Sequence, residues 1–226
     1  HPWIQTTAYD LDNNVIFSKY ASEAGQGTRT ADLLISSAPN LWVYATRQKF
    51  LVNYDPLELS AFPKFAKQYK GVFIISPDPA IIMYNKLLLK DKVPQSLTQM
   101  ANDPGTYGEL TGYTVDNLFG YTGLWGYVQK QGWSNLEKIG KDKFTAQTGV
   151  AGQRSLVSQG AAVAAYLTSP TVRLGIETDP ALSKILGWTY NKDATPLIPR
   201  GMGITTKAAS PASAKMFLNW LFTKAG

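Results

Sequence analysis

The sequence contains no cysteine, and its one histidine is His1. These absences exclude zinc sites built from cysteine and histidine, cysteine nucleophiles, and catalytic triads in which an internal histidine is the base. A Gly-Lys-Ser/Thr phosphate loop, a Gly-x-Ser-x-Gly elbow, a His-Glu-x-x-His helix and a dinucleotide fingerprint are also missing. We therefore expect a protein without enzymatic activity, without a cofactor and without a metal site.

Long apolar stretches are missing as well. The apolar runs at 87–89 and 161–167 are far shorter than the roughly 18 residues of a membrane span. The chain has 226 residues, of which 44% are hydrophobic and 17% charged, and this is typical of one large or two modest folded domains. The lack of cysteine suits an oxidising compartment. The start at His1, without methionine or a signal-peptide pattern, indicates a processed or trimmed chain.

The positive charge is unevenly distributed along the chain. There are 22 lysines and arginines against 16 aspartates and glutamates, a formal charge of +6, and residues 1–110 hold 10 of each sign. The excess therefore lies in residues 111–226, where the cations are scattered and form no stripe. We expect no nucleic acid partner from this pattern. A mildly positive field suits a small anionic ligand, and it equally suits an ordinary solvated surface.

Helical and extended patterns alternate. The spacing predicts helices over 15–23, 41–49, 121–131, 133–143 and 153–159, and strands over 31–35, 71–76, 80–84, 109–114 and 161–166. A last helix begins with Ser210 as N-cap and Pro211 at its first position. The alternation predicts the α/β class, and the segment at 102–112, rich in Asp, Pro and Gly, is the predicted boundary between two lobes.

Polar residues follow several of the predicted strands. Ligands of open α/β sheets bind where strands end, because helix N-termini there present unpaired N–H groups and a positive dipole end. The candidate ligand-binding residues are Ser36, Ser37, Asn40, Asn117, Gly120, Tyr121, Thr122, Tyr166 and Thr168. The same residue types cap helices, and a tyrosine also packs in cores, so both interpretations stay open.

Several stretches resemble, in the same order, the type II periplasmic substrate-binding proteins of ABC transporters, a family that includes ferric-ion, thiamine and other small-solute binders. The stretches are SEAGQG at 22–27 with ADLLISS at 31–37, DPAIIMYNK at 78–86, VSQGAAV at 157–163, and GMGITTKAASP at 201–211 with AKMFLNWL at 214–221. Their order covers residues 10–226, and the chain resembles a family member shortened at both ends.

The resemblance implies a two-lobe periplasmic-binding-protein-like fold with mixed sheets flanked by helices. Lobe 1 is expected to be 1–110 with 198–226 returning to it, lobe 2 to be 111–197, and the hinge to lie near 102–112 and 197–203. The implied function is to capture a solute between the lobes and to present it to an ABC permease. The implied location is the periplasm, or outside the cell in association with the membrane. An enzyme with the same two-lobe fold and a solute-sensing module for a membrane receptor are alternatives.

The resemblance and the chemistry of the candidate loop residues together suggest the class of solute. Ferric-ion binders of the family carry two adjacent tyrosines after the second-lobe strand, whereas Tyr166 is followed here by Leu167. This favours a small anion held by hydroxyl, amide and backbone N–H groups with Arg200 or Arg154 as a bidentate partner, and a ferric-ion transport protein is the alternative.

The resemblance also bears on the sheet of lobe 1. Family members begin with a strand that this chain lacks. An unpaired sheet edge would result, and such an edge predicts a homodimer.

Overall fold

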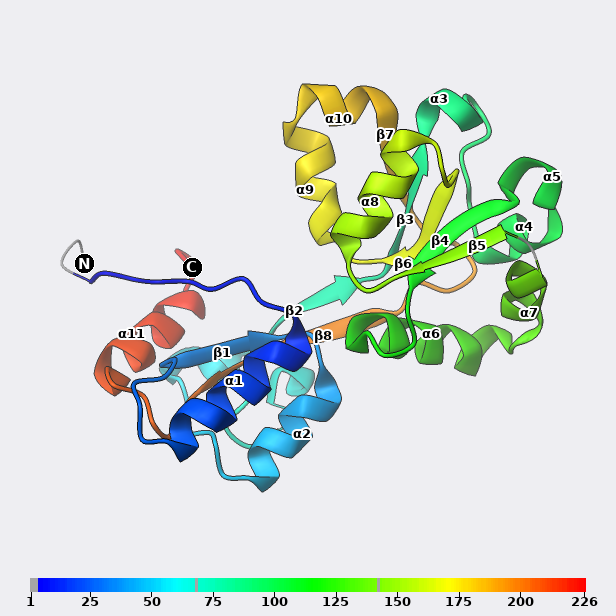
Figure 1. Ribbon diagram of the computed structural model, residues 1–226. Helices are drawn as coiled ribbons and strands as arrows, with labels where there is room; N and C mark the ends of the chain where they lie inside the picture. Colours follow the sequence, from blue (N-terminus) through cyan, green and yellow to red (C-terminus); the bar gives the residue numbers. More distant parts are fainter. Residues whose placement is uncertain (1–3, 68, 142) are drawn as a thin grey trace. The chain divides into compact units, whose positions relative to one another are not determined.

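A computed structural model describes residues 4–67, 69–141 and 143–226. The chain forms two compact units (Figure 1). Unit 1 combines the residues up to Pro77 with Pro199–Gly226, and unit 2 is Asp78–Ile198. The chain thus passes twice between the units.

Unit 1 is built on a three-stranded sheet. Its strand order is β1 (Leu33–Ser36), β8 (Leu197–Ile204) and β2 (Phe73–Pro79), and β1 is antiparallel to β8. Helices α1 (Asn13–Gly25) and α2 (Pro39–Arg47) pack on one face through Phe17, Tyr20, Leu34, Trp42, Ala45 and Val72. Helix α11 (Pro211–Leu221) packs on the other face through Leu59, Phe73, Met202, Ile204, Ala214, Leu218 and Phe222. Two 3-10 turns, Leu57–Ala61 and Lys64–Lys67, complete the unit.

Unit 2 has a five-stranded mixed sheet in the order β5 (Lys143–Gln147), β4 (Glu109–Tyr113), β6 (Ala164–Thr168), β3 (Ile81–Asn85) and β7 (Leu186–Tyr190). Strand β4 is parallel to β5 and β6, and β3 is antiparallel to β6 and β7. One face carries α3 (Lys86–Leu89), α4 (Leu97–Asn102), α5 (Pro104–Tyr107), α6 (Leu118–Gln131) and α7 (Ser134–Lys141). The other face carries α8 (Val150–Gln159), α9 (Thr171–Thr178) and α10 (Pro180–Ile185) (Figure 1).

Several local predictions differ from the structure. Strand β2 runs on to Pro79, although the prolines at 77 and 79 predicted a break. The helix expected over 133–143 ends at Lys141, and a strand that the sequence did not predict begins at Lys143. Ser210 stands at the N-cap of α11, but its side chain makes no cap bond; its backbone N–H instead donates to Asp32 Oδ1 at 2.8 Å.

The first division between the units also differs from the predicted one. It lies after Pro77, not after residue 110, because β3 pairs with β6 and β7 and because Leu89, Leu97 and Tyr107 belong to the core of unit 2. The segment at 102–112, expected as a hinge, forms α5 and the start of β4 inside unit 2. Strands β2 and β8 carry the chain across the divisions at 77–78 and 198–199.

Candidate functional site

Three helices of unit 2 begin along the same edge of its sheet. Strands β5, β4 and β6 are parallel, so their carboxyl ends share this edge. Each strand leads into a helix that begins there: α6 after β4, α8 after β5 and α9 after β6 (Figure 1). The first N–H groups of a helix have no partner within the helix, and its N-terminus carries a partial positive charge. The edge is therefore suited to holding an anion.

A small recess lies between the first turns of α8 and α9. It has a volume of about 120 Å³ and is lined by Val150, Ala151, Arg154, Thr171 and Val172. Gly149, the N-cap of α8, has no side chain with which to cap the helix. The guanidinium of Arg154 extends toward α9, since its Nη1 would lie 3.8 Å from a Cβ atom at Gly175. Arg154 forms no ion pair with any residue that the structure describes.

Four buried polar atoms at the same edge have no hydrogen-bond partner within the described part of the chain. They are both amide atoms of Gln153, and the hydroxyl oxygens of Thr114 and Thr168. Gln153 lies in α8 and Thr168 ends β6, and the exposed fraction of each is 0%. Thr114 directly follows β4. A buried polar group without a partner costs about 1–3 kcal/mol, so a group that completes the bonding of these atoms, an ordered water included, would stabilise this edge of the sheet.

The backbone of β6 is strained beside these atoms. Leu167 has φ of +47°, in the left-handed region, although it carries a branched side chain and is buried. The pairing of β6 with β3 shifts register here, between the pairs Ile81–Thr168 and Met83–Ala165. A bulge of this kind redirects the side chains that follow it, and such strain is concentrated at functional sites.

Three of the predicted site residues in unit 2 stabilise the first turns of α6 or let it pack closely on the sheet. Asn117 is its N-cap and accepts from Gly120 N at 2.9 Å, while its Nδ2 donates to Thr148 O at 2.8 Å. The hydroxyl of Thr122 donates to Leu118 O. A Cβ atom at Gly120 would lie 2.2 Å from Tyr113 Cβ, so only glycine allows α6 to approach β4 this closely. Tyr121 lies one position further along α6 and is 54% exposed.

Tyr166 lies in the core of unit 2. Its ring packs against Phe144 with centroids 5.6 Å apart, and burial raises the pKa of its hydroxyl. Thr168, two positions further on, supplies one of the buried hydroxyl oxygens described above.

The buried hydroxyl of Tyr166 predicts a loss of stability in alkali. In the unfolded chain a tyrosine ionises near pH 10, whereas the raised pKa keeps Tyr166 protonated in the folded chain. Above about pH 10 the folded chain therefore binds more protons than the unfolded chain, and the free energy of unfolding falls by up to about 1.4 kcal/mol per pH unit through this group. We expect Tyr166→Phe to flatten the dependence by this amount in urea titrations between pH 8 and 11. Tyr121→Phe is the control at an exposed position, and an equal flattening by both variants would contradict the assignment.

The predicted residues of unit 1 share an edge of its own sheet. Asn13, the first residue of α1, accepts from Ser36 Oγ at 2.7 Å and from Ser37 N at 3.2 Å. Asn40 is exposed in the first turn of α2. Arg200 precedes Gly201, which pairs with Ser36 across the β1–β8 ladder. These four predicted residues lie in unit 1, whereas the recess belongs to unit 2.

The sequence did not single out Thr171, which lines the recess, or Gln153 and Thr114, which have buried atoms without a partner among the described residues. The missed strand β5 explains the omission of Gln153, because without β5 the sequence does not predict that α8 begins at the end of a strand. Arg154 was named as an alternative anion partner, and the structure places it at the recess.

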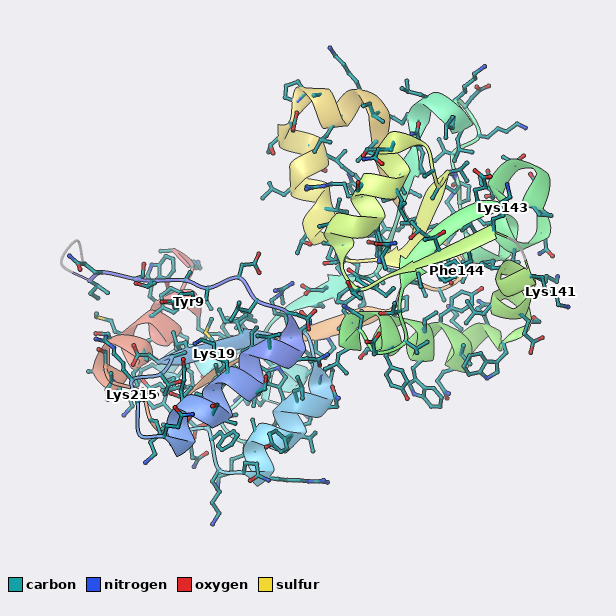
Figure 2. The ribbon with its side chains drawn as sticks, viewed as in Figure 1. Tyr9, Lys19, Lys141, Lys143, Phe144 and Lys215 are labelled. Carbon is teal, nitrogen blue, oxygen red and sulfur yellow. The ribbon has the colours of Figure 1, made fainter. Side chains whose placement is uncertain are left out.

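A larger recess lies at the opposite edge of the unit 2 sheet. Its volume is about 690 Å³, and it is lined by Pro104, Gly105, Thr106, Gly108, Glu109, Lys141, Lys143 and Val163. Figure 2 labels Lys141 and Lys143 where α7 ends and β5 begins. Lys143 forms an ion pair with Glu109 at 2.9 Å. The helices that begin at this edge, α3 and α5, have four residues each, whereas α6, α8 and α9 at the first edge have 14, 10 and 8 residues.

The described residues include no cluster of three or more His, Cys, Asp or Glu side chains suited to a metal ion. None of the helices in the described ranges has the length and apolar character needed to cross a membrane.

Comparison with known proteins identifies the family. The family model for bacterial extracellular solute-binding proteins matches residues 4–226. The chain belongs to this family. The resemblance seen in the sequence is thereby confirmed. No curated protein sequence is significantly similar to this solute-binding chain.

Solved structures of periplasmic binding proteins share the fold of the solute-binding chain. The substrate-binding protein of an ABC transporter from Agrobacterium tumefaciens is 20% identical, with a TM-score of 0.82, and the match covers 96% of this chain and 66% of that protein. AfuA from Actinobacillus pleuropneumoniae, with fructose-6-phosphate bound, is 15% identical with a TM-score of 0.78, covering 98% and 72%. Iron-bound HitA from Pseudomonas aeruginosa is 16% identical with a TM-score of 0.74, covering 99% and 74%.

The chain thus spans about two thirds to three quarters of the length of these proteins. The predicted fold class, an α/β protein of the type II periplasmic-binding-protein kind, is confirmed.

Proposed function

We propose that this solute-binding chain captures a small anionic solute outside the cytoplasmic membrane and delivers it to an ABC permease. The observation that carries the proposal is the recess of unit 2, which Arg154 lines between the first turns of α8 and α9, at the edge of the sheet where α6 also begins. N–H groups, a guanidinium and hydroxyls are the donors that carboxylate and phosphate oxygens accept from. The proposed role is binding without turnover, in the periplasm.

The structural neighbours support the transport role and the class of solute. The Agrobacterium tumefaciens protein is the substrate-binding component of an ABC transporter, and AfuA holds fructose-6-phosphate, an anion. Strands β2 and β8, which connect the two units, are assigned the role of hinge.

A ferric ion is the alternative solute, because HitA is iron-bound. Ferric ion is a hard cation that favours phenolate oxygens over neutral donors. Tyr166 is a poor source of one, since it is buried in the core and burial raises the pKa of its hydroxyl, which disfavours the ionised form. The hydroxyl of Tyr113 is also engaged, accepting from Ser169 N at 3.3 Å. These contacts favour the anion over the metal ion.

Native mass spectrometry of the freshly purified chain tests the proposal. We expect a retained adduct whose mass identifies a small anionic compound and which is lost when the chain is denatured. Inorganic phosphate, a sugar phosphate, a dicarboxylate and ferric citrate are then compared by thermal shift. An anion at 100 times its dissociation constant should stabilise the folded chain by about 2.7 kcal/mol. A bare chain that none of the anions stabilises would contradict the proposal, as would stabilisation by ferric ion alone.

A further inference from the structure

The chain leaves unit 2 through residues 193–198, called here the return segment. Its first residue, Asp193, is half-buried, and its Oδ2 atom accepts three hydrogen bonds. Thr98 donates two of them, from its backbone N at 2.9 Å and from its hydroxyl, and the hydroxyl of Tyr127 donates the third at 3.3 Å. The Oδ1 atom accepts from Ala194 N at 2.8 Å. Asp193 forms no ion pair among the described residues, so uncharged donors hold this carboxylate.

Two amide side chains extend the bonding around Asp193. Asn135 Nδ2 donates to the hydroxyl oxygens of Thr98 and Tyr127, at 2.9 and 3.0 Å. Gln131 Nε2 donates to Asp193 O at 2.8 Å. Asn135 and Tyr127 are buried, where a polar group that lost its partner would be costly. Side chains from three helices, α4, α6 and α7, therefore form one hydrogen-bonded cluster around the start of the return segment.

Beyond Asp193, the return segment lies along α6 toward the beginning of that helix. Pro196 lies against Gly126, since a Cβ atom at this glycine would be 3.3 Å from Pro196 Cβ. Ile198 is fully buried, and its Cδ1 atom would lie 3.7 Å from a Cβ atom at Gly123. The two glycines thus leave room for the chain to pack closely on the helix.

The return segment also holds the place where the chain enters unit 2. Ala80 directly follows β2, and its backbone N donates to Pro196 O at 2.9 Å. Ala80 is fully buried, and its Cβ atom would lie 3.9 Å from a Cβ atom at Gly123 of α6. The entry and the exit of the chain are therefore joined to each other inside unit 2, against the same helix.

We propose that Asp193 is a positioning residue for the hinge. It fixes the return segment against α6 and, through the hydrogen bond between Ala80 and Pro196, fixes the ends of both β2 and β8 in unit 2. The proposal rests on the hinge role assigned above to these two strands. Bending is then confined to the strand residues that precede Ala80 and follow Ile198. Because the fixed ends are already ordered, closure of the hinge costs less conformational entropy.

Hydrogen exchange of the solute-free chain, measured amide by amide by nuclear magnetic resonance, tests the assignment. Asp193→Ala removes the acceptor of Thr98 N, so the Thr98 amide should exchange about 10- to 100-fold faster. The Ala80 amide should exchange about 2- to 30-fold faster, although its acceptor is Pro196 O and not Asp193. This second change is the decisive one, because a residue that only caps α4 would not produce it.

Ser96→Ala is the matched control. Ser96 is the N-cap of α4, and its hydroxyl oxygen accepts from Gln99 N at 3.0 Å. The variant loosens the first turn of α4 and removes no hydrogen bond of Asp193. Exchange at Gln99 should therefore become faster, while exchange at Ala80 stays unchanged. Asp193→Asn is the milder variant to use if Asp193→Ala does not fold; it keeps one acceptor oxygen and should give smaller changes in the same direction.

Two results would overturn the proposal. If exchange becomes faster at Thr98 but not at Ala80, Asp193 does no more than cap α4. If Ser96→Ala accelerates exchange at Ala80 as much as Asp193→Ala does, any loosening of α4 has this effect and Asp193 has no special role. The measurement uses no solute, so its failure leaves the proposed anion binding standing, and a failure to bind anions leaves the exchange result unchanged.

Discussion

Replacing Trp42 with alanine is expected to lower the free energy of unfolding of unit 1 by about 3–5 kcal/mol, the range seen when a buried tryptophan or phenylalanine is removed. Trp42 is fully buried, and its ring meets Phe17 edge-on with centroids 5.0 Å apart. Its Nε1 donates to Ser36 O at 3.0 Å. A Cβ atom at Gly201 would lie 2.5 Å from that nitrogen, so only glycine at this position of β8 leaves room for the indole ring. The variant loses both the packing and the hydrogen bond.

Urea unfolding followed by far-ultraviolet circular dichroism, with hydrogen exchange to separate the two units, measures this loss. The amides of unit 1 should become less protected, while those of unit 2 keep their protection. Trp125→Ala is the matched control, because Trp125 is 52% exposed on α6, and its cost should stay within about 0.5 kcal/mol. Equal effects of the two variants would mean that Trp42 does not hold the core of unit 1 together.

Replacing Arg154 with methionine is expected to weaken binding of the anionic solute by about 10- to 100-fold. A hydrogen bond to a charged group contributes about 1.5–3 kcal/mol, and each 1.4 kcal/mol is a factor of ten in the dissociation constant. Arg154 lies at the start of α8, where no side chain caps the helix, and methionine keeps the aliphatic length of the side chain. Calorimetric titration with the anion identified by mass spectrometry measures the change.

Arg47→Met provides the control, since Arg47 is exposed at the end of α2 in unit 1. Its affinity for the solute should equal that of the unmodified chain. Circular dichroism of both variants shows whether the fold is retained. If the Arg154→Met variant folds and binds the anion as tightly as the unmodified chain, the recess of unit 2 is not part of the solute-binding site.

The sequence predicted those elements whose apolar pattern is strong. The strands at 31–35 and 109–114 and the last helix lie close to their observed positions at Leu33–Ser36, Glu109–Tyr113 and Pro211–Leu221. Strand β5 was missed because it is an edge strand with little buried surface, so its residues carry almost no hydrophobic signal. Without β5, the start of α8 could not be placed at the end of a strand. Most of the residues that line the recess lie in that first part of α8.

Candidate site residues were harder to predict than strands. Tyr166 and Thr168 stand on the same strand, two residues apart, yet one packs in the core and the other leaves its hydroxyl oxygen without a partner. The bulge at Leu167 separates them, and a regular period of two cannot anticipate it. Gly120 looked like a ligand-loop residue, whereas the closeness of Tyr113 gives it a packing role.

The sequence by itself determined the family, the α/β class and the order of most helices and strands, because these depend on local periodicity, capping residues and short stretches of adjoining sequence. Only the tertiary structure decided which polar groups are engaged and which are not. Asn13 binds Ser36 and Ser37, and Asn117 binds the carbonyl of Thr148. The partners in these hydrogen bonds are more than 20 residues apart in the sequence, so local sequence patterns do not predict them. A hydrogen bond needs both partners in place, so whether a polar side chain is free to hold a solute depends on residues distant in the chain.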